Sequence, residues 1–273
     1  MKKGILPILA GIVVLFTLYC SDTKDKDIND TTVSHSEIQK QINVQNFFNT
    51  LPPATTIYEI IQKSKLNYNS DYLNDPVKHK NYSLEKSRAL NLGVYGADLS
   101  IAATFNQVQE SMLFLKCTNY LAQELGISPA FDESTMERLE RNKENRDSVL
   151  QIVSKAFKKA DKIFVENKRG SLSVLMIVGS FVESMYVAGE YGLSKKEDTL
   201  SIKKIQELYF QQKESLSYLI ELLEMSADVD DRSLLEKLKN IQQIFSQQEN
   251  NNEQFLRAHE IFTEIKKQIV NVY

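Results

Sequence analysis

The chain has 273 residues, of which 42% are hydrophobic and 25% are charged, and its formal net charge is −3. This length can form one large domain or two small ones with a real core. The near-neutral charge argues against the broad basic surface that nucleic-acid binding requires. Only 9 Gly and 5 Pro occur, and because strand-rich proteins need many turns built from these residues, the composition favours long helices.

The amino terminus resembles a bacterial lipoprotein signal. Two lysines precede an uncharged run, residues 4–19, which ends at Cys20. A spanning helix needs about 20 apolar residues, so this run is short for an anchor and fits a secretory signal. The usual lipoprotein box has Leu three residues before the Cys and a small residue directly before it, whereas this chain has Thr17 and Tyr19. We expect cleavage after residue 19 and lipidation of Cys20; an uncleaved anchor and a plain secretory signal are the alternatives.

Residues 20–50 are predicted to be a flexible polar tether. Their first part, "SDTKDKD", is highly charged; it either resembles the surface-export signal of Bacteroidota-type lipoproteins or simply keeps the tether solvated. Several acyl chains on one cysteine would make attachment durable. The expected partner is therefore a membrane, reached through lipid on Cys20, and the expected location is the bacterial cell envelope, at either face of the outer membrane.

The remainder, residues 51–273, is predicted to be an all-α, multi-helix bundle of about seven helices, because apolar residues recur every three or four positions. The expected helices lie at about 57–65, 84–125, 133–169, 171–193, 199–225, 231–248 and 251–271. Within 133–169, the polar stretch "ERNKENRD" is either a solvated helix face or a short interruption. Ser83, Asp132 or Ser134, Asp198 and Asp231 are the expected amino-terminal caps, and Gly126 and Gly170 the expected stops. In the long helix, Gly93 and Gly96 predict a bend or a close helix contact.

The segment 171–193, "SLSVLMIVGSFVESMYVAGEYGL", is apolar nearly all round. Such a helix belongs in the centre of a fold. It has fewer than twenty apolar residues and contains Glu183, so it is a poor candidate for a membrane span.

Two acids in apolar surroundings are the candidate site residues. Asp98 shares its helix face with Tyr95 and Gln109, and Glu183 lies one turn from Tyr186 on the central helix. A buried carboxylate must find donors, a cation or a proton. Three interpretations are open: hydrogen bonding that orders a tight helix crossing, a pocket that binds a small ligand, or a metal site.

The sequence contains none of the common catalytic or metal-binding motifs, such as His-Glu-x-x-His, Cys-x-x-Cys, a P-loop or Gly-x-Ser-x-Gly. No cofactor is therefore predicted. Once Cys20 carries lipid, Cys117 has no disulfide partner, and its place in an amphipathic stretch predicts a small buried core residue.

Three stretches of the chain, "LGVYGADLSIAATFNQVQESMLFLKCTNYLAQELGI", "FDES" and "VGSFVESMYVA", together resemble a group of uncharacterised all-helical lipoproteins of Bacteroidota-type Gram-negative bacteria. The resemblance covers roughly residues 83–225. It implies a lipoprotein signal and a helical fold, and it implies no catalytic residue.

Taken together, these patterns predict a lipid-anchored envelope protein that is non-catalytic and either binds a ligand or serves a structural role. Its partner besides the membrane would be a small ligand or a protein. The first alternative is an envelope hydrolase or metal-dependent enzyme with its site near Asp98 and Glu183. The second is a scaffold that docks a membrane protein complex through an exposed apolar groove.

Overall fold

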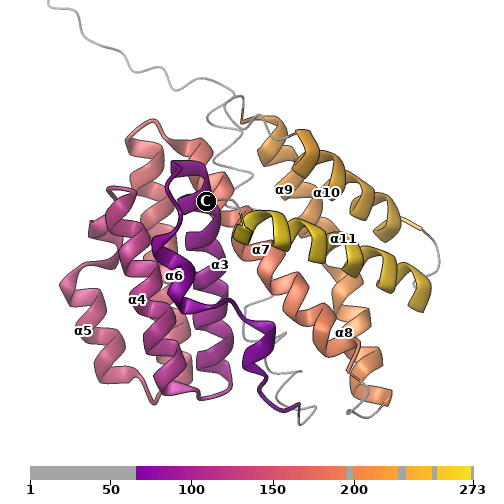
Figure 1. The fold of residues 1–273 in the computed structure, drawn as a ribbon, viewed down its shortest axis with the longest axis horizontal. Coiled ribbons are helices and arrows are strands. Elements are labelled where there is room, and N and C mark those ends of the chain that lie inside the picture. Colours follow the sequence, from indigo (N-terminus) through magenta and orange to yellow (C-terminus); the bar gives the residue numbers. More distant parts are fainter. Residues whose placement is uncertain (1–65, 195–198, 227–231, 248–250, 272–273) are drawn as a thin grey trace, which may run out of the picture. The chain divides into compact units, whose positions relative to one another are not determined.

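The computed structural model describes residues 66–194, 199–226, 232–247 and 251–271, and within these ranges every regular element is a helix (Figure 1). The all-α prediction is therefore confirmed. The described residues form nine α-helices, although about seven were expected for the whole domain. The predicted signal, the tether and the helix at about 57–65 lie outside the described residues, as do Asp198 and Asp231.

The α-helices are α3 (Glu85–Thr104), α4 (Val108–Glu124), α5 (Glu133–Asn142), α6 (Arg146–Glu166), α7 (Gly170–Gly192), α8 (Thr199–Gln211), α9 (Lys213–Glu224), α10 (Arg232–Phe245) and α11 (Asn252–Asn271). Three short 3-10 helices, η1 (Ser70–Tyr72), η2 (Pro76–Lys80) and η3 (Ser128–Phe131), lie in the first half of the described chain.

The expected single helix over 84–125 is wrong, because the chain breaks at Asn106. This residue has φ 56°, a left-handed conformation that Asn tolerates better than most residues. The amides of Asn106 and Gln107 bond back to the carbonyls of Ala103 and Ala102, which is the Schellman arrangement that ends a helix. The result is two helices, α3 and α4, in place of one.

The expected glycine stop at Gly170 and the cap at Ser83 are also wrong. The residue in the left-handed conformation after the end of α6 is Lys168, which has φ 58°. Gly170 is instead the first residue of α7. Helix α3 begins after Leu84, which provides no side-chain cap. By contrast, Gly126 ends α4 in a left-handed conformation as predicted, with φ 70°.

Further helix boundaries follow local side-chain chemistry. Asp132 caps α5 as expected, and Asn145 caps α6 in the polar stretch that separates these helices. The expected helix 199–225 divides at Gln212, whose amide bonds to the carbonyl of Tyr209 three residues back. The side chain of Gln212 also donates to the carbonyl of Leu208, and α9 starts from this point.

Helix α7 lies at the centre of the described helices, as predicted. It packs against α3, α6, α8, α9 and α11, and hydrophobic clusters lie on two sides of it, one formed with α3, α4 and α6 and one with α8 to α11. Of the described helices, α7 alone is long and apolar enough to cross a membrane, but most of it is buried inside the protein. It is therefore the core helix of the fold.

Helices α3 and α7 cross at glycines. A Cβ on Gly93 would lie 1.9 Å from the carbonyl oxygen of Met176, and a Cβ on Gly179 would lie 1.9 Å from that of Leu90. Backbone therefore meets backbone here, and no larger residue fits without a shift. This close approach is one of the two outcomes that the glycines in the α3 sequence predicted.

Residues 66–82 form an irregular segment, indigo in Figure 1, that we call the strap. Its backbone carbonyls accept hydrogen bonds from side chains of four helices. The bonds run from Tyr191 to Asn67, from Lys266 to Tyr72, from Tyr95 to Asp75, from Cys117 to Pro76 and from Arg88 to Tyr82. The strap's own backbone bonds are confined to the short turns of η1 and η2, so these side chains add the contacts that hold it to the helices.

Candidate functional site

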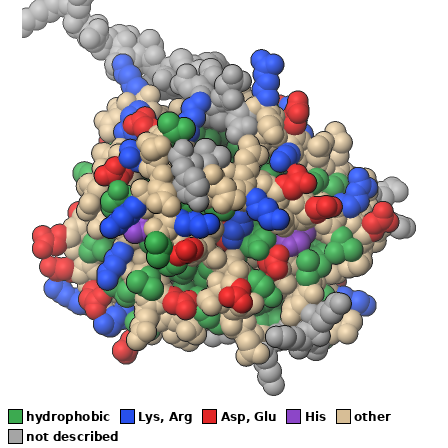
Figure 2. All heavy atoms as spheres, in the orientation of Figure 1, with side chains coloured by type: hydrophobic (Ala, Val, Ile, Leu, Met, Phe, Trp, Pro, Cys, Tyr) green, Lys and Arg blue, Asp and Glu red, His purple; other side chains and the backbone are tan. Residues whose placement is uncertain are grey.

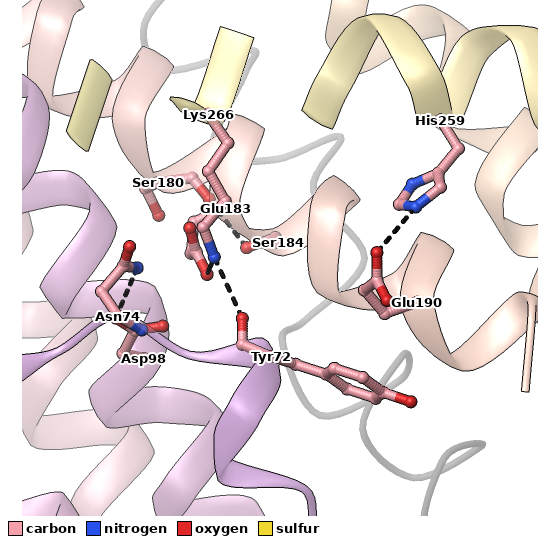
Figure 3. Close-up of polar contacts among 9 residues, drawn as sticks. All are labelled: Tyr72, Asn74, Asp98, Ser180, Glu183, Ser184, Glu190, His259 and Lys266. Atoms are coloured by element: carbon pink, nitrogen blue, oxygen red, sulfur yellow. Dashed lines mark hydrogen bonds and ion pairs between the residues drawn. The ribbon is translucent and has the colours of Figure 1, made fainter. Parts of the chain in front are cut away.

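The candidate site is a line of polar side chains between α7 and α11 (Figure 3). Glu183, Tyr186 and Glu190 are three and four residues apart, so they share one face of α7. Lys266 and His259 are seven residues apart and share one face of α11. We call these five residues the polar stripe; of its α7 members, Glu183 and Tyr186 were predicted from the sequence as neighbours.

The strongest contact in the polar stripe is a buried ion pair. Lys266 Nζ lies 2.7 Å from Glu183 Oε1, and the side chains are 10% and 0% exposed. The same ammonium donates to the backbone carbonyl of Tyr72 at 3.0 Å and lies 3.9 Å from the ring centroid of Tyr186. A buried ammonium needs this many partners because removing it from water is costly.

Asp98 reaches the polar stripe from α3 and is fully buried. Its Oδ2 accepts from the side-chain amide of Asn74 at 2.9 Å and from the backbone amide of the same residue at 3.3 Å. Burial, and next the charge of Glu183, raise the pKa of Asp98 well above its usual value, although Lys266 and Asn74 partly oppose the shift. The neighbouring carboxyl group of Glu183 thus favours the neutral form of Asp98, so the two acids lie close enough to affect each other's charge.

Two carboxyl oxygens in this cluster have no conventional donor. Asp98 Oδ1 and Glu183 Oε2 are both buried, and among the described residues neither accepts a bond from an N–H or hydroxyl group. Buried polar atoms in proteins are nearly always satisfied. The cluster therefore holds two carboxyl groups but only one ammonium, and its two unmatched atoms belong to the two acids that face each other.

The other end of the polar stripe pairs His259 with Glu190. His259 Nε2 lies 3.0 Å from Glu190 Oε1, and this hydrogen bond lowers the pKa of Glu190. A Cβ on Gly189 would lie 2.0 Å from His259 Nδ1, so glycine makes room for the imidazole. Tyr186 stacks on the ring of His259, and burial, followed by the charge of Glu190, raises the pKa of the Tyr186 hydroxyl.

The structure brings together three of the five residues named from the sequence. Asp98, Glu183 and Tyr186 lie in or beside the polar stripe. Tyr95 is buried nearby but donates its hydroxyl to the carbonyl of Asp75 at 2.8 Å, away from the acids. Gln109 is exposed on α4. Its expected place beside Asp98 is wrong because the helix breaks between them.

Sequence reasoning missed Lys266, Asn74 and His259. Lys266 carried a detectable signal, since it falls on the apolar face of α11 four residues after Phe262 and three before Ile269, both of which are buried. His259 lies on the same face. Asn74 carried no signal, because it belongs to a loop rich in Asn and Asp in which nothing distinguishes one residue from the next.

Cys117 is a buried core residue, as expected. Burial, with a smaller contribution from the charge of Asp98, raises the pKa of its thiol to about 12. A thiol with this pKa holds its proton at neutral pH and is a poor nucleophile.

Within the described ranges, no group of three or more His, Cys, Asp and Glu side chains is arranged to hold a metal ion. Two surface hollows lie against α5 and α6, one at the turn 140–145 and one lined by Asp132 and Lys159. Neither hollow includes Asp98 or Glu183.

These observations define the class: an all-helical protein with a buried, ion-paired polar stripe between its core helix and its last helix. A comparison of the chain with protein-family models, curated proteins and solved structures found no match.

Proposed function

We propose that this chain is a lipid-anchored protein of the bacterial cell envelope whose bundle of helices has a non-catalytic role, structural or ligand-binding. The anchor is lipid on Cys20, and the outer membrane is the proposed site. Two sequence features support this location in the cell: the uncharged run that ends at Cys20, and the charged segment directly after it. The resemblance to Bacteroidota-type lipoproteins points the same way.

One observation carries the non-catalytic part of the proposal. Asp98 and Glu183 are both 0% exposed, and the groups that bond to them are the amide of Asn74 and the ammonium of Lys266. A catalytic acid or base must reach within hydrogen-bond distance of a substrate. Here the chain's own amide and ammonium groups occupy those positions, which favours a structural role for the acids over the hydrolase alternative.

The face of the protein drawn in Figure 2 supports attachment through lipid and not through surface charge. Figure 2 shows acidic and basic side chains interspersed over the face drawn. A mixed surface gives little net attraction to anionic headgroups. Attachment would therefore depend on Cys20, which makes this residue the point to test.

The decisive experiment is Cys20→Ala expressed as the full chain in a Gram-negative host, followed by membrane fractionation and intact-mass measurement. We expect the wild-type chain to begin at Cys20, to carry acyl groups and to sediment with membranes. We expect the variant to be released or to remain unprocessed. Cys117→Ala is the matched control, and it should stay attached because this buried thiol has no part in anchoring. A wild-type chain that still begins at Met1 would refute the anchor.

Native mass spectrometry of the purified chain then separates the two non-catalytic roles. A structural protein should show only the mass of the polypeptide and its acyl groups. A ligand-binding protein should show an additional bound mass. Loss of that mass in Glu183→Gln, with retention of the fold, would place the ligand at the polar stripe.

A further inference from the structure

The buried cluster around Asp98 presents an unbalanced set of charges and donors. Asp98 Oδ2 accepts both bonds from Asn74, and Glu183 Oε1 accepts from Lys266. The other oxygen of each acid, Asp98 Oδ1 and Glu183 Oε2, has no donor within the part of the chain that the structure describes. Two ionised carboxylates would leave one negative charge without a counterion in the protein interior, which is strongly unfavourable.

A single proton resolves both problems. Placed between Asp98 Oδ1 and Glu183 Oε2, it makes one acid neutral and supplies a hydrogen bond that satisfies both unmatched oxygens. The remaining carboxylate then balances the ammonium of Lys266 one to one. Asp98 is the acid that keeps the proton, because Glu183 has the direct ion pair and Asp98 has only the neutral amide of Asn74.

We propose that Asp98 and Glu183 share one buried proton, and that with Lys266 they form a pH-sensitive latch that fastens the strap to the helices. Two strap residues contact the latch directly. Asn74 bonds to Asp98, and the carbonyl of Tyr72 accepts from Lys266. The latch also joins α3, α7 and α11, since each of these helices contributes one of its three members.

Release of the proton to solvent would change every contact in the latch. Two carboxylates would then compete for one ammonium and repel each other, and Asp98 could no longer donate to Glu183. The other titratable groups whose charge would interact with Asp98 are Tyr95 on the same helix and Cys117 on α4, and burial raises the pKa of both. They are neutral in the same pH range and supply no compensating charge.

The sign of the effect follows from the direction of the pKa shift of Asp98. A carboxyl group with a raised pKa in the folded state binds its proton more tightly there than in the unfolded chain, where its pKa is about 3.9. Its contribution to stability is fully present below that unfolded value and is lost as the pH rises through the folded value. Alkaline conditions should therefore open the latch, and acidic conditions should hold it closed.

The first test compares wild type with Asp98→Asn as full chains, by chemical denaturation at several values between pH 5 and pH 8. Asparagine can accept from Asn74 and donate to Glu183, so it imitates the protonated acid. We expect the wild-type folding equilibrium constant to fall relative to that of the variant by about tenfold per pH unit until Asp98 deprotonates. A ratio that stays constant or rises over this range overturns the proposal.

Asp132→Asn is the matched control for the first test. Hydrogen bonds from Lys159 and Thr135 lower the pKa of Asp132 to about 2. The same chemical change at this exposed cap should therefore produce no slope above pH 5. A slope equal to that of Asp98→Asn would assign the effect to the loss of any carboxylate and count against the latch.

The second test needs no variant to fold. Infrared spectra of the wild-type chain with ¹³C-labelled aspartate carboxyl groups report a protonated aspartic acid directly. We expect an isotope-shifted protonated carboxyl band at neutral pH, and we expect it to disappear at the pH where the peptides of the strap lose hydrogen-exchange protection. Absence of the band at pH 7, or strap protection that does not follow its loss, refutes the latch. Neither measurement depends on the lipid anchor. A result that refutes the latch would therefore leave the proposed function untouched, and the reverse also holds.

Discussion

Replacement of Lys266 by methionine is the most exacting test of the polar stripe. Methionine keeps most of the length of the side chain but removes the ammonium, and with it three contacts: Glu183 Oε1 at 2.7 Å, the carbonyl of Tyr72 at 3.0 Å and the ring of Tyr186 at 3.9 Å. Glu183 is 0% exposed, so water cannot replace the lost partner. The variant therefore isolates an unpaired buried carboxylate.

The expected cost is large. Removing one member of a buried pair destabilises a protein by about 3–5 kcal/mol, because the other charge stays uncompensated. For a helical body of this size each kcal/mol moves the melting midpoint by about 2–4 °C, so Lys266→Met should melt roughly 6–20 °C below wild type.

Urea denaturation of wild type, Lys266→Met, Glu183→Gln and the double variant provides a double-mutant cycle, which measures the interaction between the two residues. Glu183→Gln alone leaves the ammonium without its carboxylate and should also destabilise. The double variant Glu183→Gln/Lys266→Met buries no unpaired ion, so it should recover much of the loss. Lys162→Met is the control, because Lys162 forms an exposed pair with Glu166 at 3.6 Å and such pairs contribute at most about 1 kcal/mol. If Lys266→Met costs no more than this control, the buried pair is not what holds α11 to α7.

Two further predictions concern the helix crossing and a helix cap. Gly179→Ala should destabilise by at least about 1–3 kcal/mol, because its Cβ would meet the backbone of Leu90, and thermal melting measures this loss. Asp132→Ala should cost about 1 kcal/mol at neutral pH, because it removes the cap on the amide of Thr135. Since bonds from Lys159 and Thr135 hold the pKa of Asp132 at about 2, the pH-dependent part of this contribution should be present above about pH 4 and fade toward pH 2 in acid titrations; a difference that persists unchanged at pH 2 would contradict this.

The fold class was predictable because it follows from composition and periodicity. Few turn-forming residues and sustained three-to-four spacing leave little choice besides helices. The helix count was not predictable in the same way. Asn106 and Lys168 end α3 and α6 in left-handed conformations; lysine gives no sequence signal for such an end, and asparagine gives a weaker one than glycine. Glycine is the residue that most strongly predicts such an end from the sequence, as Gly126 did for α4.

The acids of the candidate site were predictable from the sequence, but the groups that bond to them were not. Asp98 and Glu183 were detectable because each is a lone acid among apolar neighbours, a pattern that burial makes costly without a partner. The pattern cannot show where that partner comes from. Asn74 belongs to the irregular strap, and Gln109 was misplaced because its position was extrapolated through the break at Asn106.

Lys266 shows how such a partner can be found from helical phase. Two lysines are adjacent in "EIKKQIV", and only one of them is in phase with the apolar face of α11. Lys266 follows Phe262 by one turn and is buried, whereas Lys267 is exposed. A lysine stem can lie along apolar surface, so this position alone would not require an ion pair. It becomes informative when another buried helix carries an acid with no partner in its own sequence neighbourhood. Each buried charge then needs a counterion, and the lysine and the acid can serve as counterions for each other.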